Sequence, residues 1–156
     1  MGAHLHSIQV NPEGGVPKYS VNSAFISTLG VEGDKQNNVK NHGGVLKAVC
    51  IYSLEVITSL QKQGHPIKCG TTGENLTIAG LEWSQVQAGT ILNIGDVQLE
   101  ITMPASPCYK IADSFLEGDF SCISHDVDQA MSRMYAKVIT EGTLKPGDVV
   151  ILQESA

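Results

Sequence analysis

VQLEITMPASPCYK, residues 97–110, joins the clearest strand pattern in the chain to a cysteine. Residues 97–103 alternate apolar and polar side chains, which is typical of a β-strand with one buried face. Pro104 and Pro107 end this strand, because proline lacks the backbone N–H that a sheet requires and fixes its own φ angle. The chain therefore places the thiol of Cys108 at the start of a rigid loop. That position suits a cysteine that presents its sulfur to a metal or a substrate, whereas a buried structural cysteine does not require it.

Short apolar or alternating segments recur along the whole chain, separated by turns such as Gly95-Asp96. Many short strands with few helices between them favour a closed or nearly closed barrel over an α/β sandwich. We therefore expect a single, mainly β domain over residues 1–156, built as a β-barrel with a few short helices. Besides residues 97–103, the predicted strands are 5–10, 24–29, 47–52, 75–78, 91–94, 133–140 and 149–152.

One helix is predicted from Leu54 to about Gln63. Ser53 is a suitable N-cap, an acidic residue lies in the first turn, and Gly64 follows the last predicted turn. Leu54, Ile57 and Leu60 recur at the spacing of one helix face. Shorter helical pieces are expected near residues 82–86, 109–116 and 126–131.

The composition is that of a soluble globular protein: 156 residues, 42% hydrophobic and 17% charged, with a net charge of −6. The acidic balance argues against nucleic-acid binding, although a few local cations are enough to hold a small anion. No apolar run approaches the roughly 20 residues of a membrane span, and the N-terminus does not resemble a signal peptide. We therefore expect no nucleic-acid or membrane partner and a cytoplasmic location.

The four cysteines form no Cys-x-x-Cys pair and no zinc-binding pattern. A free cysteine is commonly a small buried hydrophobic residue, and Cys50 in the run AVCIY fits that interpretation. Cys69 and Cys122 carry no local signal. Cys108 differs from all three because of the prolines around it.

Three further stretches carry polar residues of functional interest. Residues 41–44 read NHGG and Lys47 follows; this is either a loop in which backbone approaches a ligand or simply a turn before a strand. Glu74, in a glycine-bounded loop with Asn75, is a ligand, a general base or a surface acid. Arg133 is the sole arginine, and at a strand mouth it serves either phosphate or carboxylate capture or a surface salt bridge.

Seven stretches together resemble the MOSC family, the domain found at the C-terminus of molybdenum cofactor sulfurases and as free-standing small proteins. They occur in the family's order and span nearly the whole chain. Each is weak alone, and their order makes the resemblance specific. They are GGVPK (14–18), GVEGDKQ (30–36), HGGVLKAV (42–49), GENLT (73–77), PCYK (107–110), RMYAKV (133–138) and KPGDVV (145–150).

The resemblance implies a β-barrel that binds the molybdenum cofactor, a pterin dithiolene with a phosphate. Cys108 matches the family cysteine, which is expected to ligate molybdenum or to carry a sulfane sulfur as a persulfide. Soft thiolate chemistry suits both roles. Arg133 and Lys110 become candidates for the phosphate or pterin, and Asn41 with His42 for the cofactor rim. The full set of candidate cofactor-binding residues is Asn41, His42, Gly43, Gly44, Lys47, Glu74, Asn75, Lys110 and Arg133.

Two departures from the family pattern affect the expected function. Ala130-Met131 stands where many relatives have a Gly-Trp-like pair, so the substrate side of the pocket is expected to differ. The chain also ends at Ala156 without the extra modules of larger reductases or a cysteine desulfurase domain. Pyridoxal phosphate is therefore not expected, and redox turnover would require an external electron donor.

The leading hypothesis is a molybdenum-cofactor-binding protein that reduces N-hydroxylated small molecules or transfers sulfur. Its partners would be a small-molecule substrate and an external electron-donor or sulfur-donor protein. One alternative is a metal-free enzyme with Cys108 as nucleophile and His42 as base. Another is a module that holds the cofactor for delivery without catalysis.

Overall fold

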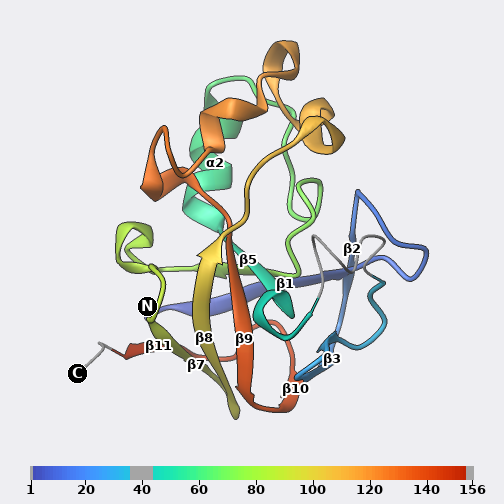
Figure 1. The fold of residues 1–156 in the computed structure, drawn as a ribbon, viewed down its shortest axis with the longest axis vertical. Coiled ribbons are helices and arrows are strands. Elements are labelled where there is room, and N and C mark those ends of the chain that lie inside the picture. Colours follow the sequence, from blue (N-terminus) through green and yellow to red (C-terminus); the bar gives the residue numbers. More distant parts are fainter. Residues whose placement is uncertain (1, 36–43, 154–156) are drawn as a thin grey trace.

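The computed structural model describes residues 2–35 and 44–153 and shows a mainly β protein (Figure 1). The strands lie in the lower part of the view, and the helical segments gather above them. The strands are β1 (His4–Val10), β2 (Tyr19–Val21), β3 (Ala24–Ser27), β4 (Gly30–Val31), β5 (Val49–Ser53), β6 (Leu76–Ala79), β7 (Ile91–Ile94), β8 (Val97–Pro104), β9 (Met134–Thr140), β10 (Gly142–Leu144) and β11 (Val150–Gln153). The helices are α2 (Leu54–Lys62) and the 3₁₀ turns η1 (Val45–Lys47), η2 (Trp83–Gln85), η3 (Tyr109–Ser114), η4 (Leu116–Gly118), η5 (Phe120–Ile123) and η6 (Gln129–Met131).

The strands form two sheets. The larger has the order β11-β7-β8-β9-β5-β6-β1-β2, and the smaller has the order β10-β3-β4. Of the pairings in the larger sheet, β5 with β6 is parallel, and α2 makes the crossover between these two strands. Ile51 in the middle of β5 lies opposite Leu76, the first residue of β6, and opposite Met134, the first residue of β9. The loop before β6 and the segment before β9 therefore lie on either side of β5.

The expected barrel is wrong in one respect, because the sheets are not closed. β1 pairs with β6 along one edge, and its other edge is shared between two partners. Residues Ile8 to Val10 pair with β2, whereas His4 makes an isolated bridge to Val149, next to β11. In the described ranges, β11 and β2 remain the two edges of the larger sheet. Local strand patterns predict that a strand exists but not what its edge pairs with, which explains the error.

The strand predicted from residues 97–103 is confirmed as β8, which ends at Pro104. Val97, Leu99 and Ile101 point into the core and are at most 1% exposed, and the intervening residues are half-buried. β8 pairs with β9 along most of its length, with Gln98 opposite Thr140 and Pro104 opposite Met134. The loop that follows Pro104 therefore starts beside the beginning of β9.

The predicted helix is also confirmed as α2. Ser53 caps it, since its Oγ accepts a hydrogen bond of 3.1 Å from the backbone N–H of Val56. Val56, Ile57 and Leu60 form its buried face, and the helix packs on β5 and β6. The shorter helical pieces expected near 82–86, 109–116 and 126–131 are 3₁₀ turns.

Several predicted boundaries need correction. Lys47 ends η1, so the strand predicted to start there begins at Val49. Asn75 and Arg133 each lie one residue before the strand that was expected to include them. The short strands β2, β4 and β10 were not predicted.

No helix in residues 2–35 or 44–153 is both long and apolar enough to cross a membrane.

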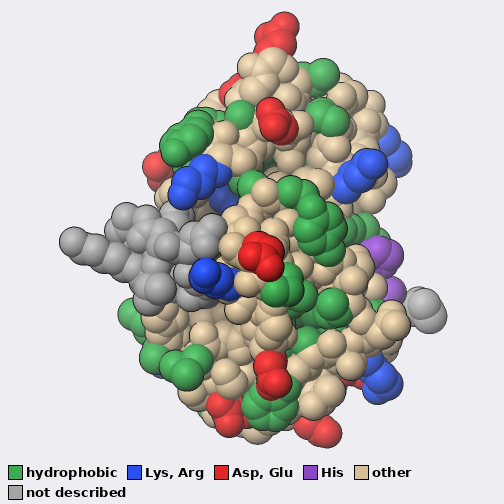
Figure 2. All heavy atoms as spheres, turned by 90° about the vertical axis from the view of Figure 1, so that its right-hand side faces the viewer, with side chains coloured by type: hydrophobic (Ala, Val, Ile, Leu, Met, Phe, Trp, Pro, Cys, Tyr) green, Lys and Arg blue, Asp and Glu red, His purple; other side chains and the backbone are tan. Residues whose placement is uncertain are grey.

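The face in Figure 2 narrows at mid-height between an upper and a lower part, and basic side chains lie on either side of this waist among scattered acidic ones.

Candidate functional site

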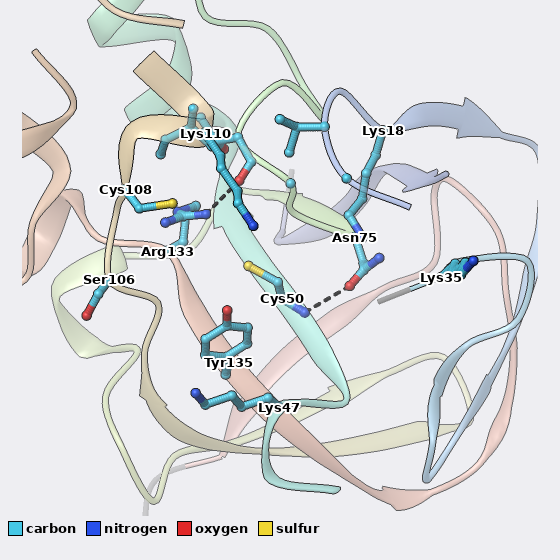
Figure 3. A pocket seen from close by; sticks show the side chains of 15 residues that line it. Lys18, Lys35, Lys47, Cys50, Asn75, Ser106, Cys108, Lys110, Arg133 and Tyr135 are labelled. Carbon is cyan, nitrogen blue, oxygen red and sulfur yellow. Dashed lines mark hydrogen bonds between the residues drawn. The ribbon is translucent and has the colours of Figure 1, made fainter. Parts of the chain in front are cut away.

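A cavity of about 240 Å³ lies where the loop after β8, the loop before β6 and the start of β9 meet (Figure 3). The loop after β8 contributes Ser106, Cys108, Lys110 and Ile111 to its lining. The loop before β6 contributes Thr72, Gly73 and Asn75; Arg133 and Tyr135 come from the start of β9, and Cys50 comes from β5. The remaining lining residues are Gly15, Val16, Lys18, Lys35 and Lys47.

Cys108 is half-buried at this cavity. Its backbone is extended, and η3 begins at the next residue, with the N–H of Ile111 donating 3.1 Å to the Cys108 carbonyl. In Figure 3 the sulfur of Cys108 points into the cavity beside Arg133. The loop that follows Pro104 and contains Pro107 therefore presents the Cys108 thiol to the cavity.

Arg133 connects two of the loops that form the cavity. Its guanidinium donates 2.6 Å from Nη1 to the Thr72 carbonyl and 3.2 Å from Nη2 to the Ala105 carbonyl. The backbone N–H of Ala105 in turn donates 3.0 Å to the Arg133 carbonyl. Arg133 is 7% exposed, and its Nε has no hydrogen-bond partner among the described residues. A buried donor without a partner is uncommon.

Two aromatic side chains hold the backbone immediately before Arg133. The indole Nε1 of Trp83 donates 2.7 Å to the Ser132 carbonyl, and the hydroxyl of Tyr52 donates 2.7 Å to the Met131 carbonyl. Both rings are buried; the bond from Trp83 is buried as well, and the bond from Tyr52 is part-buried. Met131 itself belongs to η6. Sequence analysis missed this arrangement, because neither aromatic residue lies in a recognisable motif.

The cavity is strongly basic. Lys18, Lys35, Lys47, Lys110 and Arg133 line it, which is half of the ten basic residues in a chain of net charge −6. No Asp or Glu of the described segments is part of the lining. Local cations in a confined site attract anions even when the whole protein is acidic. Sequence analysis had selected Lys47, Lys110 and Arg133 but not Lys18 or Lys35, although both lie in stretches that carry the family resemblance.

The Lys18 ammonium forms an ion pair with Asp34, and both side chains are largely buried. Asp34 also accepts 2.9 Å from the Asn75 amide and 2.8 Å from the backbone N–H of Asn11. Asn75 is therefore a connecting residue, because its amide oxygen accepts 3.1 Å from the backbone N–H of Cys50. This network fixes one side of the cavity.

Tyr135 and Cys50 are neutral groups at the cavity. Burial raises the pKa of Tyr135 to about 12, and the Lys47 ammonium lies 5.4 Å from the centre of its ring. Burial likewise raises the pKa of Cys50 to about 11, with the nearby Arg133 charge opposing the shift. Cys50 is buried as expected from its apolar run, and it also faces the same cavity as Cys108.

Glu74 lies beneath the loop instead of lining the cavity. It is fully buried, and its carboxylate accepts 3.0 Å from the Gly70 N–H and 2.9 Å and 3.3 Å from the hydroxyls of Thr72 and Thr77. Burial raises its pKa, and the hydrogen bonds from Gly70 and Thr72 oppose that shift. Its position supports the loop that carries Thr72.

The structure thus brings Cys108 together with Lys47, Asn75, Lys110 and Arg133 of the predicted set. Gly44 is exposed and caps η1 away from the lining. Asn41, His42 and Gly43 lie outside the described residues. In the described part of the chain, no group of three or more His, Cys, Asp or Glu side chains is placed to hold a metal ion.

Comparison with known proteins identifies relatives. The uncharacterized protein YflK of Bacillus subtilis is 31% identical over 137 residues, which cover 86% of this chain and 61% of YflK. Protein YiiM of Escherichia coli is 36% identical over 112 residues, covering 67% of this chain and 50% of YiiM. A Gibberella moniliformis protein named "Reductase" is 27% identical over 135 residues, 83% of this chain but 24% of that protein. The chain therefore spans less than two thirds of the length of each of these relatives.

Solved structures share the fold. The crystal structure of YiiM from Escherichia coli superimposes with a TM-score of 0.67 at 24% identity, covering 97% of this chain and 71% of YiiM. That of the YuaD protein from Bacillus subtilis gives a TM-score of 0.76 at 14% identity, with 100% and 98% covered. Residues 38–151 match the family described as "MOSC domain", and they include every part of the cavity except its Gly15–Lys35 side. The chain therefore belongs to the MOSC domain family.

Proposed function

We propose that the cavity binds the molybdenum cofactor and that Cys108 supplies the protein's sulfur to it, as a molybdenum ligand or as the carrier of a persulfide. The observation that supports this most directly is a half-buried thiol in a cavity lined by five cations and, among the described residues, by no carboxylate. A phosphate-bearing pterin requires local positive charge, and its metal requires soft donors.

The residues present fit such a group. Arg133 has five N–H donors and uses two on carbonyl groups, and its Nε is buried without a partner among the described residues. A guanidinium is a planar cation that offers paired N–H donors to phosphate oxygens, which makes Arg133 the candidate cation for a phosphate. When bound, the cofactor supplies two-electron redox chemistry that these side chains do not have.

The other residues of the cavity have supporting roles in this proposal. Lys47 and Lys110 add positive charge, and the Lys18–Asp34–Asn75 network keeps the opposite side in place. Tyr135, with a pKa of about 12, holds a proton at its hydroxyl near neutral pH. Cys50, with a pKa of about 11, remains a neutral thiol, which leaves Cys108 as the sulfur donor.

The proposed reaction is the reduction of an N-hydroxylated small molecule, with electrons from an external donor protein. The relative named "Reductase" favours this over sulfur transfer, although the chain matches 24% of that protein. Sulfur transfer through a Cys108 persulfide is the second candidate, since a half-buried thiol at an open cavity is accessible to a donor.

The test is metal and pterin content after purification from a host that makes the cofactor. Wild-type protein should contain equimolar molybdenum and pterin, and Cys108→Ser should lose most of the molybdenum. Cys122→Ser is the matched control, because Cys122 is similarly half-buried but does not line the cavity. Wild-type protein without molybdenum or pterin would refute the proposal.

A second measurement separates the two reactions. Cyanide releases sulfane sulfur as thiocyanate, so a persulfide carrier yields thiocyanate that Cys108→Ser does not. A reductase converts an N-hydroxylated compound when a reduced viologen dye provides electrons. Thiocyanate release without reduction would favour sulfur transfer.

A further inference from the structure

The positive charge at the cavity exceeds what one phosphate neutralises. Five cations line it; Asp34 neutralises one of them, and the buried Glu74 would neutralise another only if it is ionised. A phosphate monoester carries about −1.5 to −2 at neutral pH. The Cys108 sulfur, bound to the metal as a thiolate, offsets one more cation. One positive charge therefore remains when Glu74 is protonated, the form that its burial favours. Residues 36–43 contain no Asp or Glu in their sequence, so that segment does not supply the missing anion.

Lys35 and Lys110 are the two cations of the cavity that are exposed and form no ion pair within the described ranges, and only Lys110 lies on the loop that carries Cys108. Lys18, by contrast, forms an ion pair with Asp34. Lys47 lies over the Tyr135 ring, and Arg133 is bonded to two loop carbonyls. Lys110 is two residues from Cys108 on the same loop, and in Figure 3 its side chain extends from this loop into the cavity.

We propose that Lys110 binds an acidic group of the substrate, so that the preferred substrates are N-hydroxylated compounds bearing a carboxylate or phosphate. This inference rests on the proposed function, because it places the reacting compound beside Cys108. The ammonium is a mobile point charge on a flexible stem, which suits recognition of anions attached to different frameworks. The fixed guanidinium of Arg133 remains for the cofactor.

The test uses a matched pair of compounds with the same reacting group, benzamidoxime and 4-carboxybenzamidoxime. Isothermal titration calorimetry of the wild-type protein should show the carboxylate compound binding roughly tenfold more tightly, the effect of one charge-assisted contact. The ratio of the two kcat/KM values, with reduced viologen as electron donor, should favour the carboxylate compound similarly. This preference should weaken as salt is added, because the contact is exposed.

Lys110→Gln should bring both ratios close to one, and Lys110→Arg should restore them. Lys62→Gln, which removes an exposed cation from α2 outside the cavity, should leave the ratios at wild-type values. Ratios are compared because any effect of Lys110 on cofactor binding alters both compounds together. Thermal unfolding of each variant checks that the fold is retained.

Three results would overturn the inference. The first is equal binding of the two compounds to the wild-type protein, and the second is a preference that survives in Lys110→Gln. The third is release of an equimolar nucleotide with the pterin on acid treatment, since a second cofactor phosphate would then account for the surplus charge. A protein without molybdenum would refute the proposed function instead, and the calorimetric comparison would still report on Lys110.

Discussion

Replacing Trp83 by Phe should weaken the cavity without disrupting the fold. The indole Nε1 donates 2.7 Å to the carbonyl of Ser132, which is fully buried and directly precedes Arg133. Phe fills most of the same space but cannot donate, so the carbonyl loses this hydrogen bond. A buried polar group left without its partner costs about 1–3 kcal/mol of the free energy of unfolding. For a chain of this size, that corresponds to a fall in Tm of roughly 2–10 °C.

Tyr52→Phe is the matched variant, because it removes only the hydroxyl that donates 2.7 Å to the Met131 carbonyl. Both residues hold the same short backbone segment, so their effects should not add. Once the first variant has loosened the segment, the second should cost less. A double-mutant cycle in urea, with the four free energies of unfolding, measures this coupling.

The functional consequence should exceed the loss of stability. Ile94→Val in β7 is the control, since Ile94 is fully buried outside the cavity and its substitution costs a similar 0.5–1.5 kcal/mol, roughly. Molybdenum retention should fall more in Trp83→Phe than in Ile94→Val, because only the first displaces Arg133. If both aromatic variants change the unfolding free energy by less than about 0.5 kcal/mol, the proposed support of Arg133 is refuted.

Three further predictions concern individual residues. Gly70→Ala should lower the free energy of unfolding in urea by about 2–4 kcal/mol, because a Cβ at this φ of +87° would lie 2.2 Å from the Lys18 carbonyl oxygen. Gly89→Ala is the control: its φ is +92° but its Cβ would meet open space, so it should cost about 1 kcal/mol. Burial raises the pKa of Glu74, so the stabilisation by its protonated form is complete below the ordinary value of 4.5 and is lost as the pH rises through the folded-state pKa. The difference in unfolding free energy between wild type and Glu74→Gln should therefore shrink with rising pH. A difference that stays constant with pH would contradict the raised pKa. Iodoacetamide at pH 8 should label Cys108 well before Cys50, whose pKa is about 11, and peptide mass spectrometry that found Cys50 labelled first would reverse the assignment of the two thiols.

The parts of the fold that the sequence predicts are those determined by neighbouring residues. β8 follows from alternation, because a strand with one buried face places every second side chain in the core. α2 follows from the Ser53 cap and the spacing of Leu54, Ile57 and Leu60, although Val56 is buried in place of Leu54. The openness of the sheets does not follow from any local pattern, because it depends on how β1 divides its edge between β2 and Val149.

The same distinction applies to the site. Cys108 is recognisable because its two prolines lie beside it in the sequence. The role of Lys18 is not, because its position depends on a hydrogen bond of 2.8 Å from its backbone N–H to the carbonyl of Gly70, far away in the chain. Glu74 is a similar case: the sequence leaves it as a ligand, a general base or a surface acid, and its burial and its three hydrogen-bond donors are visible only in the fold.

Hydrogen bonds between side chains and distant backbone hold the loops of the cavity in place. Arg133 joins the loops of Thr72 and Ala105, Trp83 and Tyr52 fix the segment before Arg133, and Asn75 and Glu74 fix the loop before β6. These hydrogen bonds are directional and costly to lose, so they fix the conformation of loops that lack the backbone hydrogen bonds of a sheet. Arg133 lies in a largely buried position; its guanidinium donates to two carbonyl groups and interacts electrostatically with Glu74, but among the described residues it has no carboxylate in hydrogen-bond contact. The anionic ligand that we propose for the cavity would add a favourable interaction with this cation.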